Sequence, residues 1–162
     1  VEPAAELLEA ARGKILLNWY GSSAYIHDYW RSLTTAQVLP FVRTLGPQRL
    51  ASIQHGLTKE ARENLPNELI LLGDDIDQGE HGFLETAVIL RAALALVTTD
   101  TAIAHLAGAL GVSTHLILGP LADWRWEWQK STTPWYPTMT LHRWKTPEDL
   151  PKLAKEIEQL LT

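Results

Sequence analysis

Short apolar runs alternate with amphipathic stretches along most of the chain. The runs at 14–19, 49–54, 69–72, 94–97 and 114–118 have the length of strands. Their nearly continuous hydrophobicity is typical of parallel strands that are covered on both faces. Stretches with helical periodicity separate these runs. This alternation predicts an α/β fold, a doubly wound and mostly parallel Rossmann-like sheet with helices on both faces.

The helical stretches have recognisable beginnings and ends. The pair Thr34-Thr35 begins one of them and Thr58 begins another, and Pro147 begins the last one. Pro40 lies inside a predicted helix, which is therefore expected to bend or to begin late. Residues 1–13 are predicted to form a linker helix from a preceding domain, and residues 14–162 one domain. The other predicted elements are helices at 34–45, 58–64, 83–93 and 147–161 and a last strand at 139–141.

The segment Ala93–Pro120 is predicted to form one βαβ unit. Thr98-Thr99-Asp100 places side-chain oxygens after the first strand of this unit, where a helix is expected to begin. The first N–H groups of a helix lack partners and carry partial positive charge, so an anion is well placed beside them. His105 follows Thr101 by four residues and shares its helix face. The simpler interpretation is that Asp100 only caps the helix and His105 packs against the sheet.

Two loops have compositions that bear on function. Tyr20–Ser32 is long and mixes glycine, serine, aspartate and aromatic residues, which is more common in functional loops than in simple connections. The acidic loop with Asp74, Asp75 and Asp77 raises the question of a divalent metal. We prefer a solvated acidic loop, because such a loop needs no ion.

Composition narrows the class of protein. The 162 residues are 46% hydrophobic and 20% charged, which predicts one globular domain. A net charge of −5 argues against nucleic-acid binding. The absence of cysteine excludes disulfides and thiolate metal sites. No apolar segment approaches the roughly 20 residues that cross a bilayer, and the first residues lack a signal-peptide pattern, so we expect a cytoplasmic location without a membrane span.

Tryptophan is unusually frequent near the carboxyl end. The chain has seven tryptophans, and five lie between Trp124 and Trp144. The segment Leu121–Pro137 is predicted to be a loop or a short helical stretch. Its indole rings are suited to stacking on sugars or bases, to covering an apolar edge of this domain, or to docking a partner.

The motifs of this chain resemble a known family. They are DTAIAHLAGALG from Asp100 to Gly111 with FLETAVIL before it, LILGPLADWRW and PWYP after it, and WYGSSAYIHDYWRSL with SIQHG near the beginning. Together they resemble the carboxyl-terminal domain of glycosyltransferase family 9-like proteins, above all the bacterial set in which this domain follows tetratricopeptide repeats. The resemblance covers residues 14–161. A dehydrogenase or sugar epimerase is disfavoured, because no GxGxxG follows the first strand.

The resemblance implies a metal-independent GT-B glycosyltransferase with two Rossmann-like domains that face each other across a cleft. The carboxyl-terminal domain holds a nucleoside diphosphate sugar, without a further cofactor. An amino-terminal acceptor domain or tetratricopeptide repeats would belong to a longer protein. In the family's motif, an aspartate, a serine or threonine and a histidine hold the diphosphate and the sugar. The predicted donor-binding residues are Arg31, Gln54, Glu85, Thr99, Asp100, Thr101 and His105.

Some of these assignments have simpler alternatives. Arg31 is expected to clamp phosphate oxygens, or it is a surface arginine at a helix start. Gln54 is expected to bind base or phosphate. Glu85 is expected to reach ribose hydroxyls, or it only favours its helix N-terminus. Ala102 stands where the family usually has glycine, and lysine is commoner than arginine in the basic loop.

Two functions follow from these observations. The first is donor binding in a hexosyl- or heptosyl-type transferase, whose catalytic base would lie on the missing acceptor domain. In that case the isolated chain binds its donor without turnover. The second is a non-catalytic interaction module that docks a partner on the tryptophan-rich segment.

Overall fold

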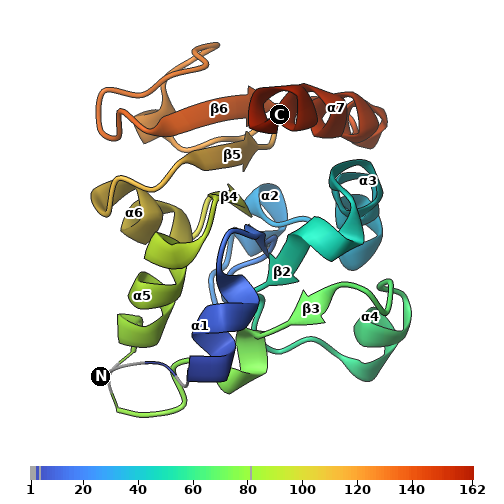
Figure 1. The fold of residues 1–162 in the computed structure, drawn as a ribbon. Coiled ribbons are helices and arrows are strands. Elements are labelled where there is room, and N and C mark those ends of the chain that lie inside the picture. Colours follow the sequence, from blue (N-terminus) through green and yellow to red (C-terminus); the bar gives the residue numbers. More distant parts are fainter. Residues whose placement is uncertain (1–2, 4, 81) are drawn as a thin grey trace.

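The sheet of this protein is parallel throughout. The structure, a computed structural model, describes residues 3, 5–80 and 82–162, and within them one six-stranded sheet has the order β3-β2-β1-β4-β5-β6 (Figure 1). All neighbouring strands pair in parallel. The predicted doubly wound, Rossmann-like fold is confirmed. The strands are β1 (Ile15–Asn18), β2 (Leu50–Ser52), β3 (Ile70–Leu71), β4 (Ala95–Thr99), β5 (Thr114–Leu118) and β6 (Met139–Arg143).

Helices cover the sheet on both faces (Figure 1). Side chains of α3 and α7 share one buried cluster with β1, whereas α1, α5 and α6 contribute to a second cluster on the other face. A short helix, α2, lies inside the predicted loop 20–32. The helices are α1 (Ala5–Ala11), α2 (Asp28–Arg31), α3 (Thr35–Leu45), α4 (Lys59–Glu63), α5 (Leu84–Ala92), α6 (Ala102–Ala109) and α7 (Leu150–Leu161).

Helix α3 begins where the sequence predicts. The Thr34 hydroxyl accepts from the Gln37 N–H at 3.2 Å, and the Gln37 side chain accepts from the Thr34 N–H at 2.9 Å. This capping box satisfies two of the N–H groups that a helix start leaves unpaired. Pro40 lies within the helix. The late start that this proline suggested does not occur.

Strand β4 is longer than predicted. Thr98 and Thr99 belong to the strand, where they pair with Leu116 and Ile117 of β5. Threonine is β-branched and fits a buried strand well, so its oxygens alone were a poor sign of a helix start. The residue that precedes α6 is Thr101.

Helix α1 is part of the packed domain. Ala11 is fully buried, and Leu7 and Ala10 pack against the same cluster as α5. A role of this helix as a linker to a preceding domain stays a prediction. None of the helices in the described ranges is both long enough and apolar enough to cross a membrane.

Candidate functional site

A cavity of about 400 Å³ lies at the carboxyl ends of β1, β4 and β5. Its walls come from the loop after β1, the beginning of α6 and the loop after β5. The strand order reverses between β1 and β4, so their loops diverge and open a crevice, which is where open α/β sheets bind ligands. Four predicted donor-binding residues line this cavity: Arg31, Asp100, Thr101 and His105.

The beginning of α6 faces this cavity. Asp100, Thr101 and Ala102 all line it, and the Thr101 side chain makes no capping hydrogen bond to the helix. Its hydroxyl donates to Asn18 Oδ1 at 3.0 Å instead. The positive end of the helix dipole is therefore directed at the cavity without a threonine cap.

Asn18, at the end of β1, is hydrogen-bonded to β4, to the residue before α6 and to Gln54, which follows β2. Its Oδ1 accepts from the hydroxyls of Thr98 at 3.2 Å and Thr101 at 3.0 Å, and its Nδ2 donates to Gln54 Oε1 at 3.1 Å. Asn18 is 5% exposed, so these bonds form in a dry environment where an unpaired amide is costly. Sequence reasoning missed this residue. The available signal was a polar side chain at the end of an otherwise apolar strand.

Gln54 fastens the ends of β1 and β2 together. Its Oε1 also accepts from the N–H groups of Trp19 at 2.9 Å and Tyr20 at 3.0 Å. Its Nε2 donates to the carbonyls of Tyr20 and His55, each at 3.2 Å. The amide is thus occupied on both ends by the protein, and a role in binding base or phosphate stays a prediction.

Glu85 lies at the start of α5 and is bonded to the acidic loop. Its carboxylate accepts from the Asp77 N–H at 2.6 Å, and Asp77 Oδ1 accepts from the Glu85 N–H at 3.0 Å. Asp74 accepts from the Gly56 N–H at 2.9 Å and pairs with Arg62. These bonds fasten the loop to the start of α5 and to the turn after β2. Among the described residues, no group of three or more His, Cys, Asp or Glu side chains is placed to hold a metal ion. Contact of Glu85 with a ribose stays a prediction.

Thr99 is the most deeply buried of the predicted residues. It is 1% exposed, and its hydroxyl oxygen has no hydrogen-bond partner within the described residues. Burying a hydroxyl without a partner costs free energy. The cavity lining does not include Thr99, and its predicted contact with a donor is untested.

Arg31 is held in place by the protein. Its Nε donates to Asp28 Oδ1 at 3.0 Å, and its Nη1 donates to the Asp100 carbonyl at 3.1 Å. The guanidinium carbon lies 4.4 Å from the centre of the Tyr25 ring. A Cβ on Gly21 would lie 2.5 Å from Nη2, so a larger residue there would displace the guanidinium from this position. These bonds use two of the five guanidinium N–H groups, and the others remain for a ligand.

His105 is oriented by contacts on several sides. Its Nδ1 is 2.9 Å from the Tyr136 hydroxyl, and its Nε2 is 3.7 Å from Asp100 Oδ1. Its ring stacks on Trp126 at a centroid distance of 5.3 Å. A Cβ on Gly108 would lie 2.4 Å from Tyr136 Cγ, so glycine on α6 allows the tyrosine to come this close. The imidazole is therefore fixed beside the start of α6.

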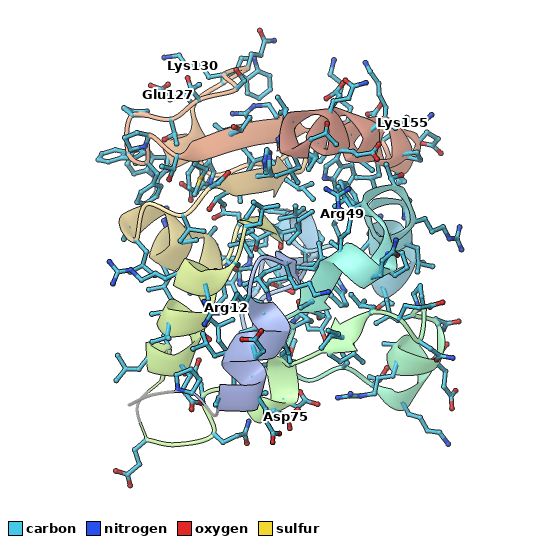
Figure 2. The ribbon with its side chains drawn as sticks, viewed as in Figure 1. Arg12, Arg49, Asp75, Glu127, Lys130 and Lys155 are labelled. Atoms are coloured by element: carbon cyan, nitrogen blue, oxygen red, sulfur yellow. The ribbon has the colours of Figure 1, made fainter. Side chains whose placement is uncertain are left out.

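The tryptophan-rich segment has both buried and exposed indoles. Trp126 is 1% exposed, whereas Trp124, Trp128 and Trp135 are 74%, 79% and 57% exposed. Arg143 of β6 donates to the carbonyls of residues 126, 127 and 130. Glu127 and Lys130 form an ion pair of 2.7 Å on the outer loop (Figure 2). The segment is thus anchored at Trp126, while three indoles face solvent.

Several solved structures have a fold similar to that of this chain. No protein-family model matches the sequence, and comparison with curated proteins found no match. Among solved structures, E. coli ADP-heptose lipopolysaccharide heptosyltransferase II is similar with a TM-score of 0.64 and 14% identity over 98% of this chain. The chain has a family 9 glycosyltransferase-like fold. E. coli heptosyltransferase WaaC, solved with ADP, has a TM-score of 0.58 and 15% identity over 93% of this chain.

A family 9 glycosyltransferase from Veillonella parvula DSM 2008 is also similar, with a TM-score of 0.52 and 13% identity over 98% of this chain. The chain spans only 52%, 44% and 45% of these three structures. The similarity supports the predicted GT-B-like architecture at the level of the fold.

Proposed function

We propose that this chain is the nucleotide-sugar-binding domain of a metal-independent GT-B glycosyltransferase of the hexosyl or heptosyl type. The observation that carries the proposal is the placement of Arg31 against Asp100 at the uncapped start of α6, in a cavity at the point where the strand order reverses. His105 and the helix N–H groups complete an environment suited to a diphosphate.

The same groups suit the chemistry of glycosyl transfer. When the bond between sugar and diphosphate breaks, negative charge grows on the leaving phosphate oxygens. Fixed N–H donors, the helix dipole and the Arg31 guanidinium stabilise that charge without a metal or other cofactor. The catalytic base and the acceptor site would belong to an amino-terminal domain, or the chain would follow tetratricopeptide repeats, in a longer cytoplasmic protein. The isolated chain is expected to bind its donor but not to turn it over.

Calorimetry with UDP, ADP and GDP tests this proposal. At least one of them should bind, and Arg31→Ala should weaken it about 10- to 100-fold, because a charge-assisted bidentate contact is lost. The matching nucleoside should be affected much less. Arg31→Lys, which restores the residue that is commoner in the family, should recover part of the affinity.

Arg43→Ala on the exposed surface of α3 serves as the matched control and should leave binding unchanged. Thermal unfolding of each variant verifies that it is folded. If all three nucleotides fail to bind at millimolar concentration, donor binding by this domain is wrong. If Arg31→Ala lowers the affinities for nucleotide and nucleoside equally, Arg31 does not bind the phosphates.

The exposed indoles favour a second candidate function, a non-catalytic interaction module. Trp124, Trp128 and Trp135 project from an anchored segment, and exposed aromatic residues are frequent at protein interfaces. Replacing all three by serine separates the two functions. If the chain is an interaction module, this variant no longer binds its partner. If the chain binds a donor, the variant still binds a nucleoside diphosphate at Arg31.

A further inference from the structure

A second hollow adjoins the proposed donor cavity. It has a volume of about 190 Å³ and is lined by His105, Trp124, Arg125, Trp135 and Tyr136. His105 and Arg125 also line the donor cavity, so the two spaces meet at these residues. We call this hollow the aromatic pocket. A ligand that extends beyond the diphosphate site on the His105 side would enter it.

The exposed aromatic walls are held in place. Trp135 Nε1 donates to the Arg125 carbonyl at 3.2 Å. The Arg125 guanidinium lies 5.2 Å from the Trp124 ring centre and is bonded to Asp123 at 2.9 Å. On the inner side, Tyr136 is fixed by its hydrogen bond to His105. A rigid apolar surface of this kind can bind a ligand without a large loss of conformational entropy.

The backbone of the same segment is strained nearby. Glu127 and Gln129 have φ angles of 51° and 62°, in the left-handed region that non-glycine residues seldom adopt. Such backbone conformations persist where surrounding contacts impose them. Arg143 supplies those contacts through the carbonyls of residues 126, 127 and 130. These bonds tie the loop that follows Trp126 to strand β6.

The chemistry of the pocket suits a sugar ring. Indole faces offer an apolar surface to the C–H groups of a pyranose, while Arg125, His105 and Tyr136 place polar atoms at its edge for hydroxyls. A flat nucleobase can stack on a different pair of aromatic rings. In the lining of the donor cavity, His27 stacks on Trp30 with a centroid distance of 4.5 Å and an interplanar angle of 7°.

We infer that the aromatic pocket binds one pyranose ring, which comes either from the sugar of the donor or from a glycan acceptor. The donor-sugar form rests on the proposed function. The stacking of a saccharide on Trp124 and Trp135 does not depend on it. In either form, this pocket selects the sugar that the protein accepts.

The first experiment compares each nucleotide with its sugar conjugate by calorimetry, using UDP with UDP-glucose, ADP with ADP-glucose and GDP with GDP-mannose. If the pocket holds the donor sugar, Trp135→Ala weakens the bound conjugate about 10-fold and leaves the nucleoside diphosphate within about 2-fold. Trp135→Phe should restore part of the loss because a ring remains. Trp128→Ala, which also removes an exposed indole but lies outside the pocket, is the control and should change nothing.

The second experiment uses saturation-transfer NMR with methyl glucoside and cellobiose at tens of millimolar. If the pocket holds an acceptor glycan, these saccharides bind and Trp135→Ala abolishes their signal. The affinities for the nucleoside diphosphates and for their sugar conjugates then stay unchanged. This experiment tests saccharide binding in the aromatic pocket even if no nucleotide binds and the proposed function is wrong.

Three results would overturn the inference. One is that Trp135→Ala changes neither conjugate nor saccharide binding. Another is that it weakens UDP and UDP-glucose equally, which would place the base in the pocket. The third is that Trp128→Ala has the same effect as Trp135→Ala.

Discussion

Single side chains determine how the turn between β4 and α6 is held. Asn18 joins this turn to β1 and, through Gln54, to the end of β2. Thr101 donates to Asn18 and not to its own helix. A buried amide at this place therefore does two things: it satisfies hydroxyls from β4 and α6, and it leaves the helix start open to the cavity.

Asn18→Asp tests this arrangement. The carboxylate keeps the size of the amide and still accepts from the two hydroxyls, but it cannot donate to Gln54 Oε1 and buries a charge. We expect a loss of about 2–4 kcal/mol in the free energy of unfolding, measured by urea denaturation at pH 7. Asn67→Asp on the exposed surface should be close to neutral. Equal stabilities would show that the Asn18–Gln54 bond does not hold the strands together.

Between the elements β5 and β6, two histidines meet in the core. His115 Nδ1 lies 3.0 Å from His142 Nε2, and the side chains are 4% and 6% exposed. One ring donates and the other accepts, so both cannot carry a second proton while this bond lasts. Burial lowers the pKa of His115 from 6.5 to about 4. Burial and the neighbouring His115 lower the pKa of His142 to about 4 as well.

This pair predicts an acid sensitivity of the β5–β6 edge. Below pH 6.5 the unfolded chain binds protons at both histidines, whereas the folded chain keeps them neutral down to about pH 4. The free energy of unfolding therefore falls as the pH drops from about 6.5 to about 4, by up to ~1.4 kcal/mol per pH unit for each histidine.

Urea denaturation at several pH values between 4.5 and 7.5 measures this slope. His142→Gln should flatten it, because one titrating group is removed, while the exposed His55→Gln should leave it unchanged. A slope that is identical in all three proteins would contradict the assignment to this pair.

At the scale of the whole molecule, the cavity joins segments that are distant along the chain. The loop after β1, the start of α6 and the loop after β5 all line it. A ligand that bridges them stabilises the entire domain, because it binds the folded state and not the unfolded chain. The proposed function therefore predicts a thermal shift in addition to a calorimetric signal.

A nucleoside diphosphate at 100 times its dissociation constant should stabilise the folded chain by about 2.7 kcal/mol. For a domain of this size, the midpoint of thermal unfolding should rise by roughly 5–10 °C. UDP, ADP and GDP are compared with uridine, adenosine and guanosine at equal concentration. A shift that is the same for nucleosides and nucleotides would indicate that the diphosphate makes no contact of its own.

The succession of strands and helices could be predicted from the sequence alone. Parallel strands covered on both faces leave continuous apolar runs, and helix starts such as Thr34 carry local capping signals, so both are visible within a short window. Motifs at a single turn, such as Asp100, Thr101 and His105, were visible for the same reason. Boundaries failed where local chemistry was ambiguous, as at Thr98 and Thr99, which continue β4.

Which distant side chains meet depends on how the strands and helices are arranged in space. Arg31 donates to the carbonyl of Asp100, 69 residues away, because β1 and β4 are neighbours in the sheet. The pairing of Asn18 with Gln54 and the burial of Trp126 beside three exposed indoles likewise depend on strand order and packing. Periodicity records which face of an element is apolar, but it contains no information on which element covers that face.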